Sequence, residues 1–219
     1  MFDCMLKAPQ EIKEIFKILE KDYRTDIDTE LKYENNYQLL IAIMLSAQAT
    51  DKGVNRATTK LFSLLKTPQD ALKLGFDKIN ALIQTINYHN VKAKHIIELS
   101  RKLVNDFNSV VPDNFEDLTS LAGIGRKTAN LVLSIAFKQN KIAVDTHCFR
   151  VANRIGLTKS KNVLESEMQL TKNVPENKHR LINQLLVQFG RDICNAKNPK
   201  CDKCKLRKYC QYYKNLLIK

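Results

Sequence analysis

The sequence predicts an all-α fold, and three observations carry this prediction. Apolar residues recur at intervals of three and four along several stretches, which is the spacing of one face of a helix. The 219 residues include only 6 glycines and 5 prolines, so the chain has few of the residues that punctuate all-β proteins. No stretch shows the strict apolar–polar alternation of a half-buried strand. Local stop signals divide the chain into about ten helices.

The expected helices follow one another along the chain. The first has an apolar stripe at Ile12, Ile15, Phe16 and Leu19. The stretch LLIAIMLSAQA, from Leu39, is apolar on all sides but too short to span a membrane, so we expect a buried helix. Two later stripes comprise Ile96, Leu99, Leu103 and Phe107, and then Leu181, Ile182, Leu185, Leu186 and Phe189. Helix boundaries are expected at TPQD (67–70), Gly75, VVPDN (110–114) and NVPEN (173–177).

The charge of the chain favours a polyanionic partner. The formal net charge is +13, and the stretch from Arg191 to Lys219 holds nine Lys or Arg against two acidic residues. Such an excess favours nucleic acid, whose condensed counterions are released on binding, although a lysine-rich surface without a partner has the same composition. The start of the sequence lacks the features of a secretory signal. We therefore expect an intracellular protein without a membrane span.

The stretch LAGIGRKTAN, residues 121–130, joins two expected helices through a tight turn. It fits neither the nucleotide-triphosphate loop nor the dinucleotide fingerprint, because its glycines have the wrong spacing for both. Phe115, Leu118 and Leu121 predict the first helix, and RKTANLVLSIAF predicts the second. Gly123 and Gly125 let the backbone approach a ligand closely, and the following helix start has unpaired N–H groups. This arrangement suits a phosphate of a nucleic-acid backbone; an ordinary corner between helices is the alternative.

Two side chains near this turn are candidates for chemistry. Lys127 follows Arg126 at a helix start, where the helix dipole and the neighbouring cation both disfavour a charged ammonium. A neutral amine can attack carbon, whereas a lysine that only contacts phosphate is the plainer interpretation. Asp145 ends an apolar run eighteen residues after Lys127 and precedes another helix. It is a natural N-cap, and a capping carboxylate can also face a ligand.

Four cysteines near the C-terminus predict a metal centre. Cys194, Cys201, Cys204 and Cys210 have the spacing C-x6-C-x2-C-x5-C within a run that is also rich in lysine. In an intracellular chain this density of thiols indicates metal ligation before disulfides. An iron–sulfur cluster suits the compact run at least as well as zinc does, so both remain open from the spacing alone.

In this order, LSAQATD (45–51), the hairpin LAGIGRKTAN, AVDTH (143–147) and the four cysteines resemble endonuclease III, a family of DNA base-excision-repair glycosylases with abasic-site lyase activity. The resemblance runs from the first helix to the last cysteine. It implies a two-lobed, all-α helix-hairpin-helix glycosylase fold with a C-terminal four-cysteine cluster loop. One lobe, of six helices, comprises residues 29–139, and the other comprises 1–28 plus 140–219.

The resemblance also implies the roles of individual residues. Lys127 is the nucleophile that forms a Schiff base, Asp145 is the essential carboxylate, and the four cysteines hold a [4Fe-4S] cluster. The expected substrate is double-stranded DNA that contains either damaged bases or abasic sites. Among damaged bases, oxidised pyrimidines are the class that we expect. The enzyme is expected to act as a monomer in the cytoplasm, on the nucleoid. We expect DNA contacts from Gln48, Tyr88, Gly123, Gly125, Arg126, Lys200 and Lys203.

Two departures from the family pattern stand out. The segment INYHN (86–90) has Asn87 and Tyr88 where the family tends to have Gly and Leu, in a loop that inserts into the duplex. The histidine that the family has before GR near the first cluster cysteine is Phe189 here.

Two other classes of protein share parts of these features. A non-catalytic helix-hairpin-helix DNA-binding protein with a structural zinc would have the same turn and the same cysteines. An iron–sulfur electron carrier would also have the cysteines, but it has little use for so basic a loop unless its partner is acidic. Trapping of a Schiff base on abasic DNA separates the enzyme from both.

Overall fold

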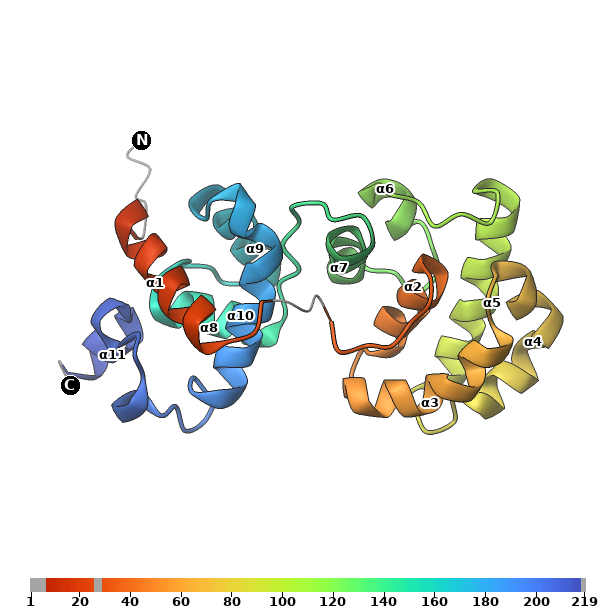
Figure 1. Ribbon diagram of the computed structural model, residues 1–219, viewed down its shortest axis with the longest axis horizontal. Coiled ribbons are helices and arrows are strands. Elements are labelled where there is room, and N and C mark those ends of the chain that lie inside the picture. The colour runs from red at the N-terminus through yellow and green to blue at the C-terminus, as the bar shows by residue number, and fades with distance from the viewer. Residues whose placement is uncertain (1–6, 26–28, 218–219) are drawn as a thin grey trace. The chain divides into compact units, whose positions relative to one another are not determined.

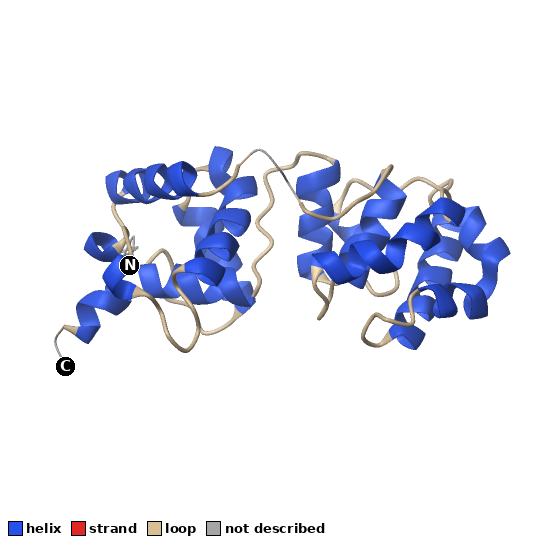
Figure 2. Cartoon of the chain, turned by 60° about the horizontal axis from the view of Figure 1, so that its bottom comes forward, coloured by secondary structure: helices blue, strands red, loops and turns tan. Residues whose placement is uncertain are grey.

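The computed structural model describes residues 7–25 and 29–217, and within these residues every regular element is a helix (Figure 2). The prediction of an all-α fold is therefore confirmed. The α-helices are α1 (Pro9–Asp22), α2 (Asn36–Leu45), α3 (Asp51–Leu64), α4 (Pro68–Leu82), α5 (His89–Asp106), α6 (Phe115–Thr119), α7 (Arg126–Ala136), α8 (Thr146–Ile155), α9 (Val163–Asn173), α10 (His179–Asp192) and α11 (Gln211–Leu216). Three short 3₁₀ helices are η1 (Glu176–Lys178), η2 (Cys201–Lys203) and η3 (Arg207–Tyr209).

The chain divides into two compact units. One is contiguous and comprises Thr29–Gln139, with α2 to α7; we call it the contiguous unit. The other comprises Met1–Asp28 and Asn140–Lys219, so that α1 and α8 to α11 come from opposite ends of the chain (Figure 1). We call this the discontinuous unit. Each unit has its own apolar core.

The contiguous unit is built around α2. All nine residues from Tyr37 to Leu45 are buried, and α2 contacts α3, α5 and α7. A helix that is apolar on all sides needs such neighbours on every side, because each exposed leucine or isoleucine would forgo roughly 1.5–3 kcal/mol of burial free energy. The buried helix expected from LLIAIMLSAQA is confirmed.

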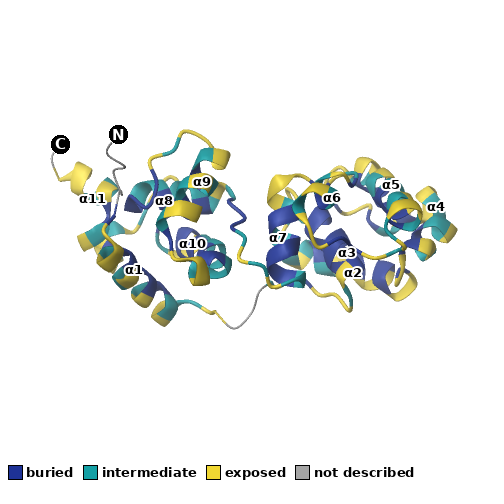
Figure 3. Ribbon diagram, turned by 90° about the horizontal axis from the view of Figure 1, so that it is seen from above, coloured by how far each residue is buried: buried dark blue, intermediate teal, exposed yellow. Residues whose placement is uncertain are grey.

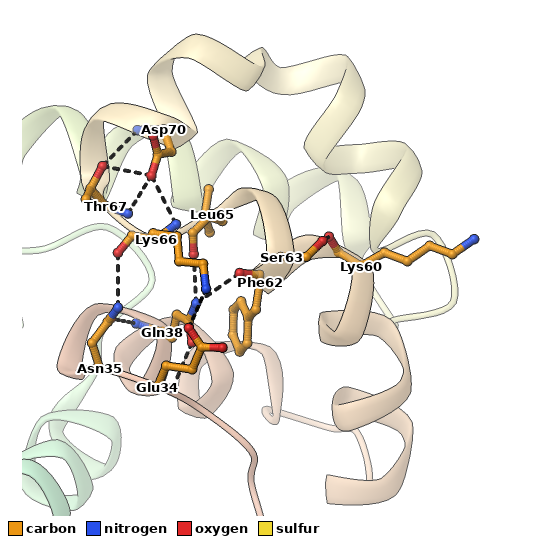
Figure 4. A network of polar contacts seen from close by, with 10 residues as sticks. All are labelled: Glu34, Asn35, Gln38, Lys60, Phe62, Ser63, Leu65, Lys66, Thr67 and Asp70. Atoms are coloured by element: carbon orange, nitrogen blue, oxygen red, sulfur yellow. Dashed lines mark hydrogen bonds and ion pairs between the residues drawn. The ribbon is translucent and has the colours of Figure 1, made fainter.

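A buried amide joins α2 to the end of α3 (Figure 4). Gln38 is fully buried, and its Nε2 donates to the carbonyl oxygens of Phe62 at 3.1 Å and Leu65 at 3.0 Å. Its Oε1 accepts the N–H of Glu34 at 2.8 Å. The polar atoms of this buried side chain are therefore satisfied, which removes the cost of burying them. Asn35 caps α2 on the same side, because its Oδ1 accepts the N–H of Gln38.

Gly75 bends α4. Its φ of 72° and ψ of 170° are not helical, so two helical segments meet at this residue. A left-handed φ is easily adopted by glycine, and the helix boundary expected at Gly75 is confirmed as a kink rather than as a loop.

In the discontinuous unit the apolar stripes of α1, α8 and α10 form the core. Ile12, Ile15, Phe16 and Leu19 are buried in α1, and α10 contributes Ile182, Leu185, Leu186 and Phe189. Helix α10 contacts both α1 and α8. Figure 3 shows the buried positions of α10 in dark blue, and most of the other positions of this helix are half-buried. The stripes expected at these residues are thus confirmed as core faces.

No helix among residues 7–25 and 29–217 has the length and apolar character needed to cross a membrane.

Candidate functional site

The glycine turn between α6 and α7 has the tight geometry that its sequence predicts. Gly123 has a φ of 77°, and a Cβ atom there would lie 2.7 Å from Nδ1 of His95. Both the left-handed backbone and the contact with α5 therefore require glycine at this position. The first helix is shorter than expected: α6 ends at Thr119, and Leu121 belongs to the turn. Turn hydrogen bonds from Leu121 N to Leu118 O and from Ile124 N to Leu121 O, each 3.1 Å, replace the helix there.

The start of α7 offers N–H groups to a ligand. Gly125 is the N-cap residue and has no side chain to accept from the first turn of the helix. Gly123, Gly125, Arg126 and Lys127 are all exposed. An exposed helix start with a glycine cap provides donors and a positive dipole end, which together suit an anion such as phosphate.

The two cations after the turn differ in their surroundings. The guanidinium of Arg126 lies over the ring of Phe115, with 4.9 Å between Cζ and the ring centroid, so the first residue of α7 contacts the first residue of α6. This contact orients Arg126 at the edge of the hairpin. Lys127 is exposed on the first turn of α7, where its amine can reach a ligand held at the helix start.

Asp145 caps α8 in the discontinuous unit. Its Oδ1 accepts the N–H of Cys148 at 2.7 Å, and the side chain is half-buried. The three residues before it, Ile142 to Val144, are buried and fix the chain as it enters the helix. The N-cap interpretation of Asp145 is therefore confirmed. A cap of this kind uses one carboxylate oxygen, and the half-exposed group can offer its charge to a ligand.

Two exposed loops of the contiguous unit carry Gln48 and Tyr88. Gln48 lies between α2 and α3 with a φ of 57°, and Tyr88 is the N-cap residue of α5 with a φ of 59°. Tyr88 is 66% exposed, which is unusual for so large an aromatic side chain. The side-chain amide of Asn87 donates to the carbonyl oxygen of Gln48 at 2.9 Å, so the two loops are in direct contact.

The four predicted cysteine ligands line one cavity of the discontinuous unit, together with the apolar side chains of Ile155, Phe189, Ile193 and Leu206. All four are free thiols; Cys194 and Cys210 are buried, and Cys201 and Cys204 are half-buried. We call residues 194–210 the cysteine loop. Burial raises the pKa of Cys204 to about 11, and burial also raises the pKa of Cys201 and Cys210. Without a cation these thiols stay protonated, whereas a bound metal deprotonates them.

The side chains that line the cavity suit an iron–sulfur cluster. Four cysteines face one cavity, and four cysteine thiolates are the ligand set of a [4Fe-4S] cluster. Thiolate is also the ligand that iron–sulfur clusters require. The donor set present in the chain therefore fits a [4Fe-4S] cluster.

Arg154 of α8 holds the start of the cysteine loop. Its Nη1 lies 3.5 Å from Sγ of Cys194 and donates to the carbonyl of Asn195 at 2.7 Å, while Nη2 donates to the carbonyl of Ala196 at 2.9 Å. Its guanidinium also lies over the ring of Tyr212, 4.6 Å from the centroid. No pattern in the sequence singles out this residue. An arginine on the polar side of a helix is visible in the sequence, but its loop partners are about forty residues away.

The loop lysines expected to contact DNA are exposed. Lys203 ends η2, and Lys200 lies 3.7 Å from the carboxylate of Asp192, with both side chains at least half exposed. Lys205 pairs with Asp22 at 2.7 Å. The surface of the loop is therefore basic, but some of its cations already have an acidic neighbour.

Comparisons with known proteins point to one family. The sequence model of the HhH-GPD superfamily base excision DNA repair proteins matches residues 41–176. The chain is similar to endonuclease III of Haemophilus influenzae, with 48% identity over 184 residues, which are 84% of this chain and 87% of the relative. It is also similar to endonuclease III of Rickettsia felis, with 43% identity over 209 residues, covering 95% and 98% of the two chains.

A comparison with solved structures points to the same family. A structure described as a trapped endonuclease III–DNA covalent intermediate, in an estranged-adenine complex, superimposes with a TM-score of 0.89 at 36% identity and covers 96% of this chain and 99% of that one. Because 96% of the chain is covered, the likeness includes most of both units. The chain therefore belongs to the endonuclease III family, within the HhH-GPD superfamily of base excision DNA repair proteins.

Proposed function

We propose that this base-excision-repair DNA glycosylase and abasic-site lyase acts on oxidised pyrimidines, with Lys127 as its nucleophile. The observation that carries the proposal is the place of Lys127, exposed on the first turn of α7 beside N–H groups that suit a backbone phosphate. A phosphate bound at the helix start would bring the neighbouring sugar within reach of the amine. The trapped covalent intermediate described for a structural neighbour supports the same role.

The chemistry follows from the amine. A damaged nucleotide turned out of the duplex exposes its sugar carbon C1′. The neutral amine of Lys127 attacks C1′, a carbon–nitrogen bond forms, and the bond to the base breaks, so that the base leaves with its electron pair and takes up a proton. The nitrogen gives up a proton, and its electron pair forms the carbon–nitrogen double bond as the bond between C1′ and the ring oxygen breaks; the ring oxygen takes up a proton, which leaves an open-chain, protonated Schiff base. Loss of a proton from C2′ then breaks the C3′–oxygen bond, which cuts the strand, and water releases Lys127.

Asp145 supplies negative charge in this proposal. Its Oδ1 caps α8, which fixes the carboxylate in one orientation. A fixed carboxylate stabilises positive charge that develops on the sugar as the base leaves, and it does so without rearranging when the reaction occurs. Asp145 would thus serve the helix and the reaction at once.

The DNA contacts come from both units. In the contiguous unit we assign them to Gln48, Tyr88, Gly123, Gly125 and Arg126, all of which are exposed. In the discontinuous unit we assign them to Lys200 and Lys203 of the cysteine loop. The glycine amides and the cations would bind phosphate, while Tyr88 would insert into the base stack as a wedge. We further propose that the enzyme acts as a monomer in the cytoplasm, on the nucleoid.

Cys194, Cys201, Cys204 and Cys210 would hold a [4Fe-4S] cluster. When bound, the cluster supplies folding free energy to the cysteine loop. Arg154 then holds the start of that loop against α8 through the carbonyls of Asn195 and Ala196. The cations of the loop would thereby face DNA from a fixed backbone.

Borohydride trapping on abasic DNA tests the nucleophile. Lys127→Gln removes the amine and leaves an uncharged side chain, whereas Lys127→Arg provides a permanent cation that cannot form a Schiff base. Both variants are expected to lose trapping, and strand cleavage should fall by orders of magnitude. Lys127→Arg should still bind a non-cleavable abasic analogue as the wild type does. Normal trapping by either variant would show that another amine forms the Schiff base and would contradict the role of Lys127, whereas absence of trapping by the wild type would leave a non-catalytic helix-hairpin-helix protein.

A further inference from the structure

Two exposed loops of the contiguous unit each present a residue in the left-handed conformation. Gln48 has a φ of 57° in the loop between α2 and α3, and Tyr88 has a φ of 59° at the start of α5. Residues other than glycine adopt this conformation only where neighbouring groups fix it. For Gln48, two of those groups come from the loop and helix that carry Tyr88.

Lys92 fixes the backbone before Gln48. Its side chain is almost fully buried, and its Nζ donates to the carbonyls of Leu45 at 2.8 Å and Ala47 at 2.7 Å. Leu45 is the last residue of α2, where carbonyl groups lack partners within the helix. The ammonium of Lys92 therefore ends α2 and holds the first residues of the loop against α5.

Asn87 fixes the next residue. Its Nδ2 donates to the carbonyl oxygen of Gln48 at 2.9 Å, from an exposed position directly before Tyr88. The backbone of the Gln48 loop is thus held at residue 47 by Lys92 and at residue 48 by Asn87. Both side chains belong to the segment that contains Tyr88.

We propose that Asn87 is a positioning residue that couples these two loops, so that Gln48 and Tyr88 engage damaged DNA as one unit. The inference rests on the DNA roles proposed above for Gln48 and Tyr88. A displacement of Tyr88 moves Asn87, which adjoins it, and the hydrogen bond transmits that displacement to the backbone of Gln48. Holding both loops in place before binding lowers the entropy lost on binding.

The coupling depends on the side chain at position 87. A glycine there would have no side-chain donor for the Gln48 carbonyl. The buried side chain of Lys92 holds the backbone of the Gln48 loop whichever residue stands at position 87. The link between the two loops, in contrast, depends on the side-chain amide of Asn87.

A double-mutant cycle tests the coupling. The quantities are the dissociation constants for a duplex with a tetrahydrofuran abasic analogue and for the intact duplex, at one salt concentration. Asn87→Ala should weaken binding to the abasic analogue by about 2- to 10-fold, the range for one lost hydrogen bond, and leave binding to intact DNA within 2-fold. In a Gln48→Ala background the same change should have little effect, because no glutamine side chain remains to be positioned.

Two further measurements separate positioning from charge and from folding. Asn87→Asp keeps the size of the side chain but cannot donate, so it should show the same selective loss as Asn87→Ala. Asn90→Asp is the matched control: it adds the same charge at a nearby exposed position and should affect both DNAs by one common factor. Amide hydrogen exchange in residues 46–49 of the free protein should accelerate in Asn87→Ala while the melting temperature stays unchanged.

Three outcomes would overturn the inference. Unchanged binding of the abasic analogue by Asn87→Ala would show that the hydrogen bond from Asn87 to Gln48 does not contribute to the binding of damaged DNA. A full loss that persists in the Gln48→Ala background shows that Asn87 acts on DNA itself rather than through Gln48. If Gln48→Ala and Tyr88→Ala both bind the abasic analogue normally, the proposed DNA role of the loops fails, and the coupling fails with it.

Discussion

The ammonium of Lys205 lies 2.7 Å from Oδ1 of Asp22, so the cysteine loop is bonded to the last residue of α1. The Asp22 side chain is 28% exposed and the Lys205 side chain 63% exposed. This pair offsets one cation of the loop, whereas Lys203 ends η2 as an exposed cation. The loop lysines therefore differ in how much charge they can offer to DNA.

The salt dependence of DNA binding should reveal this difference. Lys203→Ala should flatten the plot of log affinity against log salt by about one unit, since each neutralised phosphate contributes a slope of about −0.9. Lys205→Ala should flatten it by less, because Asp22 already neutralises part of its charge. The measurement is the affinity for undamaged duplex over a range of salt. Unchanged slopes for single changes at Lys200, Lys203, Lys205, Arg207 and Lys208 would show that the loop is not a DNA surface.

Asp145→Asn should separate capping from catalysis. Asparagine caps a helix about as well as aspartate, so the melting temperature should change little. The negative charge is lost, so base release should drop sharply while affinity for an abasic analogue stays the same or rises. Asp145→Ala is the comparison variant: it removes the cap as well and should cost a further ~1 kcal/mol of stability. Normal base release by Asp145→Asn would exclude the catalytic role.

Cys204→Ser should abolish metal binding. Loss of one thiolate removes a ligand, and the folding free energy that metal binding supplies to the loop is lost with it. The variant should therefore purify without iron and melt at a lower temperature. Cys148→Ala, at a buried cysteine outside the loop, should keep its full iron content. Full iron content and unchanged melting for Cys204→Ser would contradict the assignment.

Tyr88→Ala should weaken binding to damaged sites more than binding to intact duplex. An aromatic ring can stack where a base has left the helix, a contact worth roughly 1–3 kcal/mol per base. Tyr88→Phe keeps the ring and should bind as the wild type does. Equal losses on both DNAs for Tyr88→Ala would show that Tyr88 is not a wedge.

Acid should weaken the cap of α4. The hydroxyl of Thr67, at 2.9 Å, and the backbone N–H groups of Thr67 and Lys66 donate to Oδ2 of Asp70 and lower the pKa of this carboxyl. Because the pKa of Asp70 is lower in the folded state, its ionised carboxylate stabilises the protein at pH values above the unfolded pKa of about 3.9. This stabilisation is lost as the pH falls through the pKa of the folded state. The melting-temperature difference between wild type and Asp70→Asn should therefore narrow below about pH 4. A constant difference down to pH 3 would contradict this linkage.

Local patterns in the sequence predicted the helices well. The stripe of α1 and the apolar run of α2 specify which faces are buried, because burial requires a repeat that matches the helix. The length of α6 was overestimated. Leu121 has helical spacing from Leu118, but the turn that leads to Gly123 ends the helix two residues earlier. Where a short helix leads into a tight turn, the turn decides at which residue the helix ends. The spacing of apolar residues gives no sign of this.

Contacts between distant residues were beyond prediction from the sequence. The bond from Asn87 to Gln48 joins residues 39 positions apart, and the contacts from Arg154 to the cysteine loop join residues about forty apart. Each depends on how helices pack within a unit. The cysteines and the glycine turn were identifiable because their spacing alone restricts the ligand or the backbone conformation.

The discontinuous unit has a consequence for synthesis on the ribosome. Helix α1 packs against α10, and Tyr23 donates to Asp192 across 169 positions of the chain. The contiguous unit, residues 29–139, can therefore fold as soon as it has emerged, whereas α1 must wait until α10 has emerged to meet its partner. The four cysteines of residues 194–210 follow the glycine turn in the sequence, so they emerge after the residues of the hairpin.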